Sequence, residues 1–191
     1  MIGQLPESIE VGGVSYPIET DFRNILVFFA ACSDPELSDR DKMFILLKRL
    51  FLDGYDSIPQ ECMAEAIREA NWFINCGQME DNKKPPVKMI DWEQDEPIIF
   101  PAINKIAGME TRALPRLHWW TFIGYFMEIA DGTFSTVLQI RQKRSKGKRL
   151  EKYEQEFYRN NKNLCDIKKR YSAEEQEELD YANAILDGKA L

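Results

Sequence analysis

Apolar residues recur along most of this chain at intervals of three and four, the spacing that gathers side chains on one face of an α-helix. Residues that cap or end helices mark the boundaries of these segments. Ser38 and Asp41 can form a capping box, and Gly54 can end the helix that follows. Residues 134–163 form either two helices around a hinge near Gly147 or one uninterrupted helix. The helices that the pattern predicts cover residues 21–32, 38–54, 59–75, 97–107, 116–130, 134–144, 148–163 and 173–186.

A short β-hairpin precedes these helices. Two β-prone runs, Ile9–Val11 and Val14–Tyr16, flank Gly12 and Gly13, a pair that suits the primed turn of a two-residue hairpin. Pro17 confines the second strand to an edge or an end, because proline has no amide hydrogen to donate. A lone hairpin is marginal in water, so we expect it to lie on helices. The predicted fold class is therefore mainly α, a helical bundle of about seven helices with a small N-terminal β-hairpin.

Residues 78–90 interrupt the pattern. This stretch is polar, contains two adjacent prolines and shows no periodicity, so it is predicted to be a linker. It divides the chain into residues 1–77, with the hairpin and the first helices, and a C-terminal helical half, residues 91–191. The segment 116–130 is apolar nearly all round, which is typical of a central helix that is covered on most sides. We expect the two parts to pack as one globular unit with the last helices at its periphery.

The composition permits a folded core, and the charge is unevenly distributed. The chain has 191 residues, of which 44% are hydrophobic, and a formal net charge of −7 that disfavours non-specific binding to nucleic acid or anionic membranes. Residues 141–152 contain seven bases and one acid, a local net charge of +6. Residues 172–191 contain six acids and one base, a local net charge of −5. The two blocks could pair with each other or with other subunits.

Nothing in the pattern predicts secretion or insertion into a membrane. Residues 1–6 lack the basic and apolar regions of a signal peptide. The longest apolar run, Ile25–Cys32, has eight residues, whereas a membrane span needs about 18–20. The four cysteines are widely spaced, which favours reduced thiols over a disulfide framework. We therefore expect a protein of the cytoplasm of the cell that makes it.

Residues that could carry catalysis are sparse. His118, the single histidine, has no Cys or His nearby at metal-ligand spacing, so a core or rim histidine bonded to a carbonyl or carboxylate is favoured over a catalytic base. The acids between Asp91 and Glu96 crowd one helical turn, which favours a structural role at a helix N-terminus. No phosphate-binding loop or nucleophile elbow appears. The sequence predicts no catalytic residue, no metal site and no cofactor, and therefore not an enzyme.

The basic run, residues 141–152, is the strongest candidate for a binding surface. Its side chains could solvate a helix, dock an acidic protein partner or neutralise phosphates. Base-stacking aromatics, which single-strand binders use, are absent between Gln139 and Glu151, so nucleic acid is the least favoured of the three. The residues predicted to bind a partner are Arg141, Lys143, Arg144, Lys146, Lys148 and Arg149.

Several short signatures occur in an order that resembles a known phage family. They are Asp91-Trp92-Glu93-Gln94-Asp95, a helix ending near Ala107-Gly108, Leu117-His118-Trp119-Trp120-Thr121-Phe122 and Ile140-Arg141-Gln142-Lys143. With Leu5-Pro6, the hairpin and Asp21-Phe22-Arg23, they make the chain similar, over roughly residues 5–169, to the bacteriophage "gene product fifteen" family of Gram-positive phages and prophages. The chain departs from the pattern at Pro97 and Pro101, where ordinary helix formers are expected.

The resemblance implies a role in tail assembly and brings no catalytic residues with it. Members lie in tailed-phage structural modules, typically between the major tail protein and the tape-measure protein, a placement that resembles the tail assembly chaperones. We therefore expect a phage tail morphogenesis factor of the host cell cytoplasm, a tail assembly chaperone that binds the tape-measure protein, with homo-oligomers left open. The alternatives are a structural neck or tail-completion protein retained in the virion, or a nucleic-acid-binding phage protein that uses residues 141–152.

Overall fold

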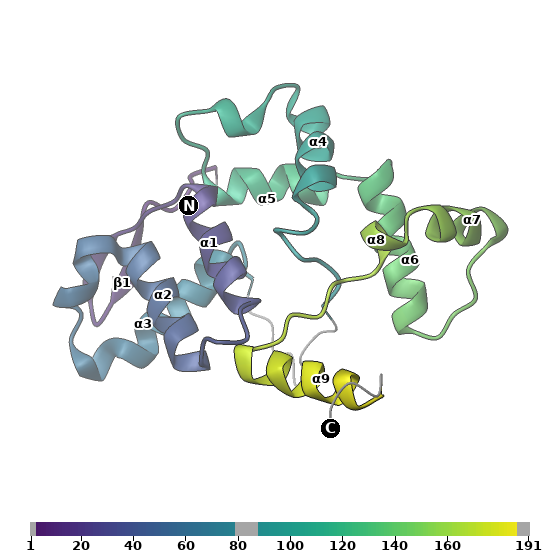
Figure 1. Cartoon of the computed structure of the whole chain (residues 1–191). Coiled ribbons are helices and arrows are strands. Elements are labelled where there is room, and N and C mark those ends of the chain that lie inside the picture. Colours follow the sequence, from purple (N-terminus) through teal and green to yellow (C-terminus); the bar gives the residue numbers. More distant parts are fainter. Residues whose placement is uncertain (1–2, 79–87, 187–191) are drawn as a thin grey trace.

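The computed structural model describes residues 3–78 and 88–186, and most of its regular structure is helical (Figure 1). A hairpin of β1 (Ser8–Val11) and β2 (Val14–Pro17) comes first. This arrangement confirms the predicted fold class, mainly α with a small N-terminal hairpin. The α-helices of the described residues are α1 (Phe22–Cys32), α2 (Asp39–Phe51), α3 (Met63–Ile74), α4 (Glu96–Ala107), α5 (Trp119–Met127), α6 (Thr133–Ser145), α7 (Lys152–Asn160), α8 (Lys162–Cys165) and α9 (Ala173–Leu186), with short 3-10 helices at Leu52–Ser57, Gln60–Cys62 and Thr111–Ala113.

The hairpin is antiparallel, with Ile9 opposite Tyr16. Gly12 and Gly13 form its turn with φ angles of 59° and 77°, a left-handed conformation that glycine adopts without a steric penalty. Ile9, Val11 and Tyr16 are buried, and β1 lies on α3. The prediction that the hairpin rests on helices is confirmed.

Local capping signals set the starts of the first helices. The Asp21 carboxylate accepts a hydrogen bond from the Arg23 amide at 3.0 Å. Ser38 and Asp41 form the predicted capping box before α2. Each of these bonds satisfies a backbone amide that has no partner within its own helix. Behind the caps, α1, α2 and α3 bury apolar side chains that include Ile25, Leu46, Leu50, Ala66, Ala70 and Phe73.

One hydrophobic core draws on both parts of the chain. Buried side chains from the hairpin, from helices α1 to α5 and from the start of α6 belong to one contiguous cluster. Within it, Phe22 of α1 stacks on Phe122 of α5 with 4.3 Å between the ring centroids. Trp119 also stacks on Phe122, with 5.8 Å between the ring centroids, and is 1% exposed. Residues 79–87, most of the predicted linker, lie outside the described residues.

Helix α5 begins at Trp119, three residues later than predicted, because the chain before it is extended and pairs with the residues that precede α1. The Leu117 carbonyl accepts a hydrogen bond from the Phe22 amide at 3.0 Å, and the Thr20 carbonyl accepts one from the Trp119 amide at 2.7 Å. The helix is also less covered than predicted. Only two of its nine residues are buried, and Met127 is 72% exposed.

Helices α6, α7 and α8 meet around a smaller hydrophobic cluster of their own. The prediction of one helix over residues 148–163 is wrong, because the chain turns before α7 and bends again after it. Gly147 has a φ of 63°, a conformation that cannot continue a helix. Glu151 then starts α7 with a capping box of its own, and Asn161 separates α7 from α8. Helix α6 begins at Thr133, one residue earlier than predicted, and Gly132 occupies the cap position.

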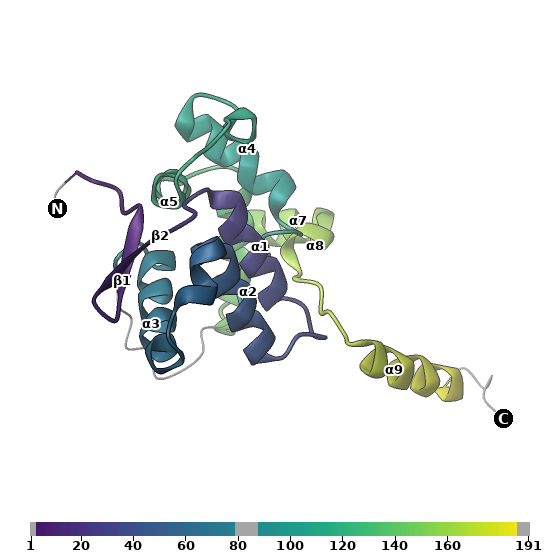
Figure 2. The same cartoon turned by 90° about the vertical axis from the view of Figure 1, so that its left-hand side faces the viewer.

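Helix α9 projects away from the rest of the chain (Figure 2). It begins at a capping box, in which the Ser172 hydroxyl accepts from the Glu175 amide at 3.1 Å and the Glu175 carboxylate accepts from the Ser172 amide at 3.0 Å. Neither hydrophobic cluster includes a described side chain of α9.

Candidate functional site

Arg141, the first residue of the predicted partner-binding run, lies inside the protein. It is 6% exposed, and its guanidinium donates two hydrogen bonds to the Asp95 carboxylate, at 2.6 Å from Nη1 and 2.8 Å from Nη2. The backbone carbonyls of Met89, Leu164 and Cys165 accept three more. A guanidinium has five N–H groups, so none remains for a partner. The prediction that Arg141 binds a partner is therefore wrong, because α6 directs this side chain into the interior.

The acidic run before α4 is partly buried: Asp91 and Asp95 lie inside the protein, whereas Glu93 and Glu96 are exposed. The Asp91 carboxylate accepts hydrogen bonds from Lys88 Nζ at 2.8 Å and from Arg170 Nη2 at 3.0 Å. It also accepts one from the Gln94 amide at 3.0 Å, which caps the turn. Burial raises the pKa of Asp91, but the hydrogen bonds from Lys88 and Gln94 outweigh it and hold the pKa below its ordinary value of 3.8. The structural role predicted for these acids is confirmed for Asp91, which caps this turn.

Lys143 and Arg144 are engaged within the α6–α8 unit. Lys143 Nζ lies 2.7 Å from the carboxylate of Glu154, whose side chain is 1% exposed. Burial raises the pKa of Glu154, but the hydrogen bonds from Lys143 and the Glu151 amide, together with the charge of Lys143, outweigh it, so the pKa lies below its usual range. Arg144 pairs with Asp166 and lies over the ring of Tyr158, 4.3 Å from its centroid. The charges of both cations are thus already matched inside the chain.

The remaining cations of the run form an exposed surface at the turn between α6 and α7. Lys146, Lys148 and Arg149, together with Lys152, are exposed. Within residues 3–78 and 88–186, none of these four cations forms an ion pair. The ion pairs of the basic run there are formed by Arg141, Lys143 and Arg144. Beside them lies a hollow of about 450 Å³ whose lining includes Leu150. These four cations, called the basic patch below, are the part of the predicted run that stays available to a partner.

His118 is a structural cap. Its Nδ1 accepts a hydrogen bond from the Trp120 amide at 3.0 Å, and its Nε2 lies 3.0 Å from the Pro6 carbonyl, which can only accept. The proton is therefore on Nε2, and both ring nitrogens are occupied. The predicted role of a histidine bonded to a neighbouring carbonyl is confirmed. In the described part of the chain, no group of three or more His, Cys, Asp or Glu is placed to hold a metal ion.

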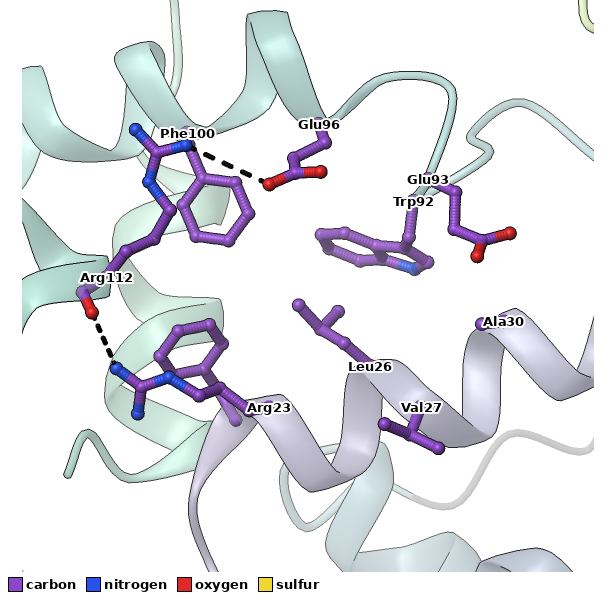
Figure 3. A pocket seen from close by; sticks show the side chains of 10 residues that line it. Arg23, Leu26, Val27, Ala30, Trp92, Glu93, Glu96, Phe100 and Arg112 are labelled. Carbon is purple, nitrogen blue, oxygen red and sulfur yellow. Dashed lines mark hydrogen bonds and ion pairs between the residues drawn. The ribbon is translucent and has the colours of Figure 1, made fainter. Parts of the chain in front are cut away.

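A groove between α1 and the start of α4 is a second candidate surface, which sequence reasoning missed (Figure 3). It has a volume of about 430 Å³. Leu26 points toward the indole of Trp92 across it, and Val27 is 41% exposed at its edge. The sequence signal was the apolar run of α1, which is wider than one buried face requires. The apolar residues of this α1–α4 groove are Phe22, Leu26, Val27, Ala30, Trp92 and Phe100.

Charged side chains stand at the ends of the α1–α4 groove. Arg23 and Arg112 are at one end, where Arg23 Nη2 donates to the Arg112 carbonyl at 2.9 Å. Glu93 is at the other end. Glu96 lies between them, 3.8 Å from Arg112. The guanidinium of Arg112 lies over the ring of Phe100, 4.9 Å from its centroid. The groove can therefore hold an apolar group whose flanks are polar or charged.

A known protein family matches most of this helical chain. The family described as Bacteriophage Gp15 protein matches residues 1–167. The chain belongs to this family. The family resemblance predicted from the sequence is confirmed, and this Gp15 protein is a phage structural or morphogenesis protein. Comparisons with curated proteins and with solved structures found no similar chain.

The residues that match the Gp15 family include both candidate surfaces. The α1–α4 groove and the basic patch fall within residues 1–167, whereas α9 begins after them, at Ala173. Within the described residues of this Gp15 protein, no helix combines the length and the apolar character that crossing a membrane requires.

Proposed function

We propose that this Gp15 protein is a tail assembly chaperone that binds the tape-measure protein in the host cytoplasm, and that it acts by binding rather than by catalysis. Membership of the family supports a role in phage morphogenesis. The observation that carries the binding role is that the α1–α4 groove presents an apolar surface with charged side chains at its ends.

The groove matches a short amphipathic helix in length. Helix α1 contributes the side from Arg23 to Ala30, and seven residues of helix rise about 10 Å, or roughly two turns. An amphipathic helix that binds in a groove presents apolar side chains at i, i+3 or i+4, and i+7, over the same distance. A coiled-coil client exposes such a stripe until it has assembled. Covering the stripe would keep the client soluble.

The charged ends of the groove favour one orientation of that client helix. A helix carries partial negative charge at its C-terminus and partial positive charge at its N-terminus. Arg23 and Arg112 would therefore receive the C-terminal end, and Glu93 the N-terminal end. The side chains of Arg23 and Arg112 keep 40% and 46% exposure, so they can reach a bound helix while they keep their internal contacts.

Co-expression with the tape-measure protein of the same phage tests the proposal. The unchanged chain is expected to raise the soluble fraction of the tape-measure protein and to co-purify with it. Val27→Glu, which puts a charge at the edge of the groove, should abolish both effects. Val14→Glu is the matched control, because Val14 is 53% exposed on β2, outside the groove. Unchanged co-purification by the Val27→Glu variant would contradict the role of the groove.

Two further measurements separate the alternatives. Mass spectrometry of purified particles should find the chain absent, whereas recovery at the copy number of a structural component would favour a neck or tail-completion protein. Binding of nucleic acid at low salt that weakens when the basic patch is neutralised would favour a nucleic-acid-binding protein.

A further inference from the structure

Helix α9 has no packing partner within the described structure. It has 14 residues, and its described side chains are exposed except for Ala184, which is partly covered. Leu179 is 38% exposed, Tyr181 66% and Ile185 51%. An isolated helix of this length is marginal in water. A surface that receives α9 would therefore stabilise it and remove apolar area from solvent.

One face of α9 combines acidic and apolar groups. Residues three and four apart share a face of a helix, and the set that does so here is Glu175, Glu178, Leu179, Ala182 and Ile185. Three more acids, Glu174, Glu177 and Asp180, surround the N-terminal half of this face. Among the described residues, the ion pairs involve none of these five acids, since the acids that pair lie between Glu19 and Asp166. The charge of the helix is unmatched in the described chain.

The basic patch is complementary to this face. Its four cations likewise have no ion pair among the described residues, and two of them, Arg149 and Lys152, line the hollow beside Leu150. Leu150 is only partly exposed. An acidic helix with an apolar stripe can pair its carboxylates with these cations while Leu179 covers Leu150. The acidic part of the α9 face is then matched by the cations of the basic patch, and its apolar part by Leu150.

Within one chain, α9 is held away from the basic patch. Arg170, just before the helix, binds Glu93 at 2.6 Å and Asp91 at 3.0 Å. The amide of Ala173, the first residue of α9, donates to the Glu36 carboxylate. From this anchor the helix extends away from α7 and α8 (Figure 2). Folding back onto the patch of the same chain would break these contacts.

We propose that α9 docks, through its acidic and apolar face, on the basic patch of a second copy of this chain. The contact joins two different surfaces, so each copy can give its α9 to one neighbour and receive the α9 of another. Such heterologous contacts generate rings or open helical arrays. The α1–α4 groove takes no part in the contact and stays open in every copy. The proposal does not rest on the proposed function.

Charge reversal on the purified full chain tests the contact by sedimentation equilibrium at an ionic strength of about 0.05 M, where exposed charges are weakly screened. Glu177→Lys with Glu178→Lys, and separately Lys148→Glu with Arg149→Glu, should each weaken self-association by about tenfold or more, because attraction becomes repulsion at two positions. The variant with all four changes should regain the original dissociation constant to within about threefold. Glu10→Lys with Glu61→Lys changes the net charge equally on exposed residues elsewhere and should leave association intact.

Three results would overturn the proposal: a monomer at all accessible concentrations at low salt, self-association that neither pair of reversals weakens, or a four-residue variant that does not regain association. All six substituted positions are exposed, so circular dichroism and the unfolding midpoint should stay unchanged and show that the fold is intact. Self-association is measured without the tape-measure protein. A failure here would therefore leave client binding by the groove standing, and the Val27→Glu experiment can fail without affecting self-association.

Discussion

Arg141 and Asp95 form a bidentate ion pair in the interior of the chain, with Nη1–Oδ2 at 2.6 Å and Nη2–Oδ1 at 2.8 Å. Their side chains are 5% and 1% exposed. The pair joins α6 to the start of α4, and the carbonyls of Leu164 and Cys165 connect α8 to the same guanidinium. Planar guanidinium and carboxylate groups match in this geometry. The unit of α6, α7 and α8 is thereby fixed to the main core by a polar link.

Removing the guanidinium should destabilise the protein strongly. Arg141→Met leaves the Asp95 carboxylate buried without its partner, which costs about 3–5 kcal/mol for comparable pairs. Arg149→Met, in the same basic run, changes an exposed side chain and should alter the free energy of unfolding by less than about 0.5 kcal/mol. Urea denaturation of both variants provides the comparison. Equal effects of the two substitutions would show that the buried pair does not hold the unit in place.

The adjacent tryptophans of α5 should differ in their contribution to stability. Trp119 Nε1 donates to the Ile74 carbonyl at 2.9 Å, and Trp120 Nε1 donates to the Phe73 carbonyl at 2.8 Å. Trp119→Phe leaves a buried carbonyl poorly satisfied and should cost about 1–3 kcal/mol. Trp120→Phe should cost about 1 kcal/mol or less, because the Phe73 carbonyl keeps the Cys76 amide as a donor and Trp120 is partly exposed. A larger loss in the Trp120→Phe variant, measured by urea denaturation, would reverse this assignment.

Stability should fall in acid partly through Asp91. Its folded-state pKa lies below the ordinary value of 3.8 because, against the opposing effect of burial, Lys88 and Gln94 donate to the carboxylate. A group with a lowered folded-state pKa stabilises the fold above its unfolded-state pKa and loses that effect as the pH falls through the folded-state pKa. Asp91→Asn should therefore lower stability at pH 7 and flatten its decline below about pH 4.

Urea midpoints between pH 7 and pH 2.5 measure this effect. Asp53→Asn is the control, because Asp53 is exposed and its substitution should leave the shape of the pH profile unchanged. A profile of the Asp91→Asn variant that runs parallel to that of the unchanged protein would remove Asp91 from the acid response.

The two glycines of the hairpin turn should tolerate substitution differently. Both have a positive φ, so alanine is strained at either position. A Cβ at Gly12 would also lie 2.7 Å from Cys62 Sγ, whereas a Cβ at Gly13 meets nothing within 4 Å. Gly12→Ala should therefore cost about 1–3 kcal/mol more than Gly13→Ala, measured by thermal or urea unfolding. Adding Cys62→Ala to the Gly12→Ala variant should recover part of this difference, and no recovery would exclude the clash as its cause.

Much of the fold was predictable because its signals are local. The capping boxes at Ser38 and Ser172, the paired glycines of the hairpin and the αL glycine at Gly108 act through backbone groups within a few residues. Pro97 was placed correctly in the first turn of a helix, where its missing amide is not needed. The boundary of α5 was missed because the residues before it pair with residues about 96 positions away, at Asp21.

The sequence by itself determined the helical class, the hairpin, the caps and the segregation of charge into a basic run and an acidic C-terminal helix. Only the tertiary structure divided the basic run into a buried arginine, two cations paired within the chain and an exposed patch. Arg141 lies at the same helical spacing as the buried Phe134 and Val137 on α6. Spacing alone cannot show that Asp95 lies on the facing segment and pairs with it. The groove also required the fold, because its walls come from α1 and from residues about 65 positions later. Local backbone chemistry sets elements, whereas burial and charge pairing depend on which elements meet.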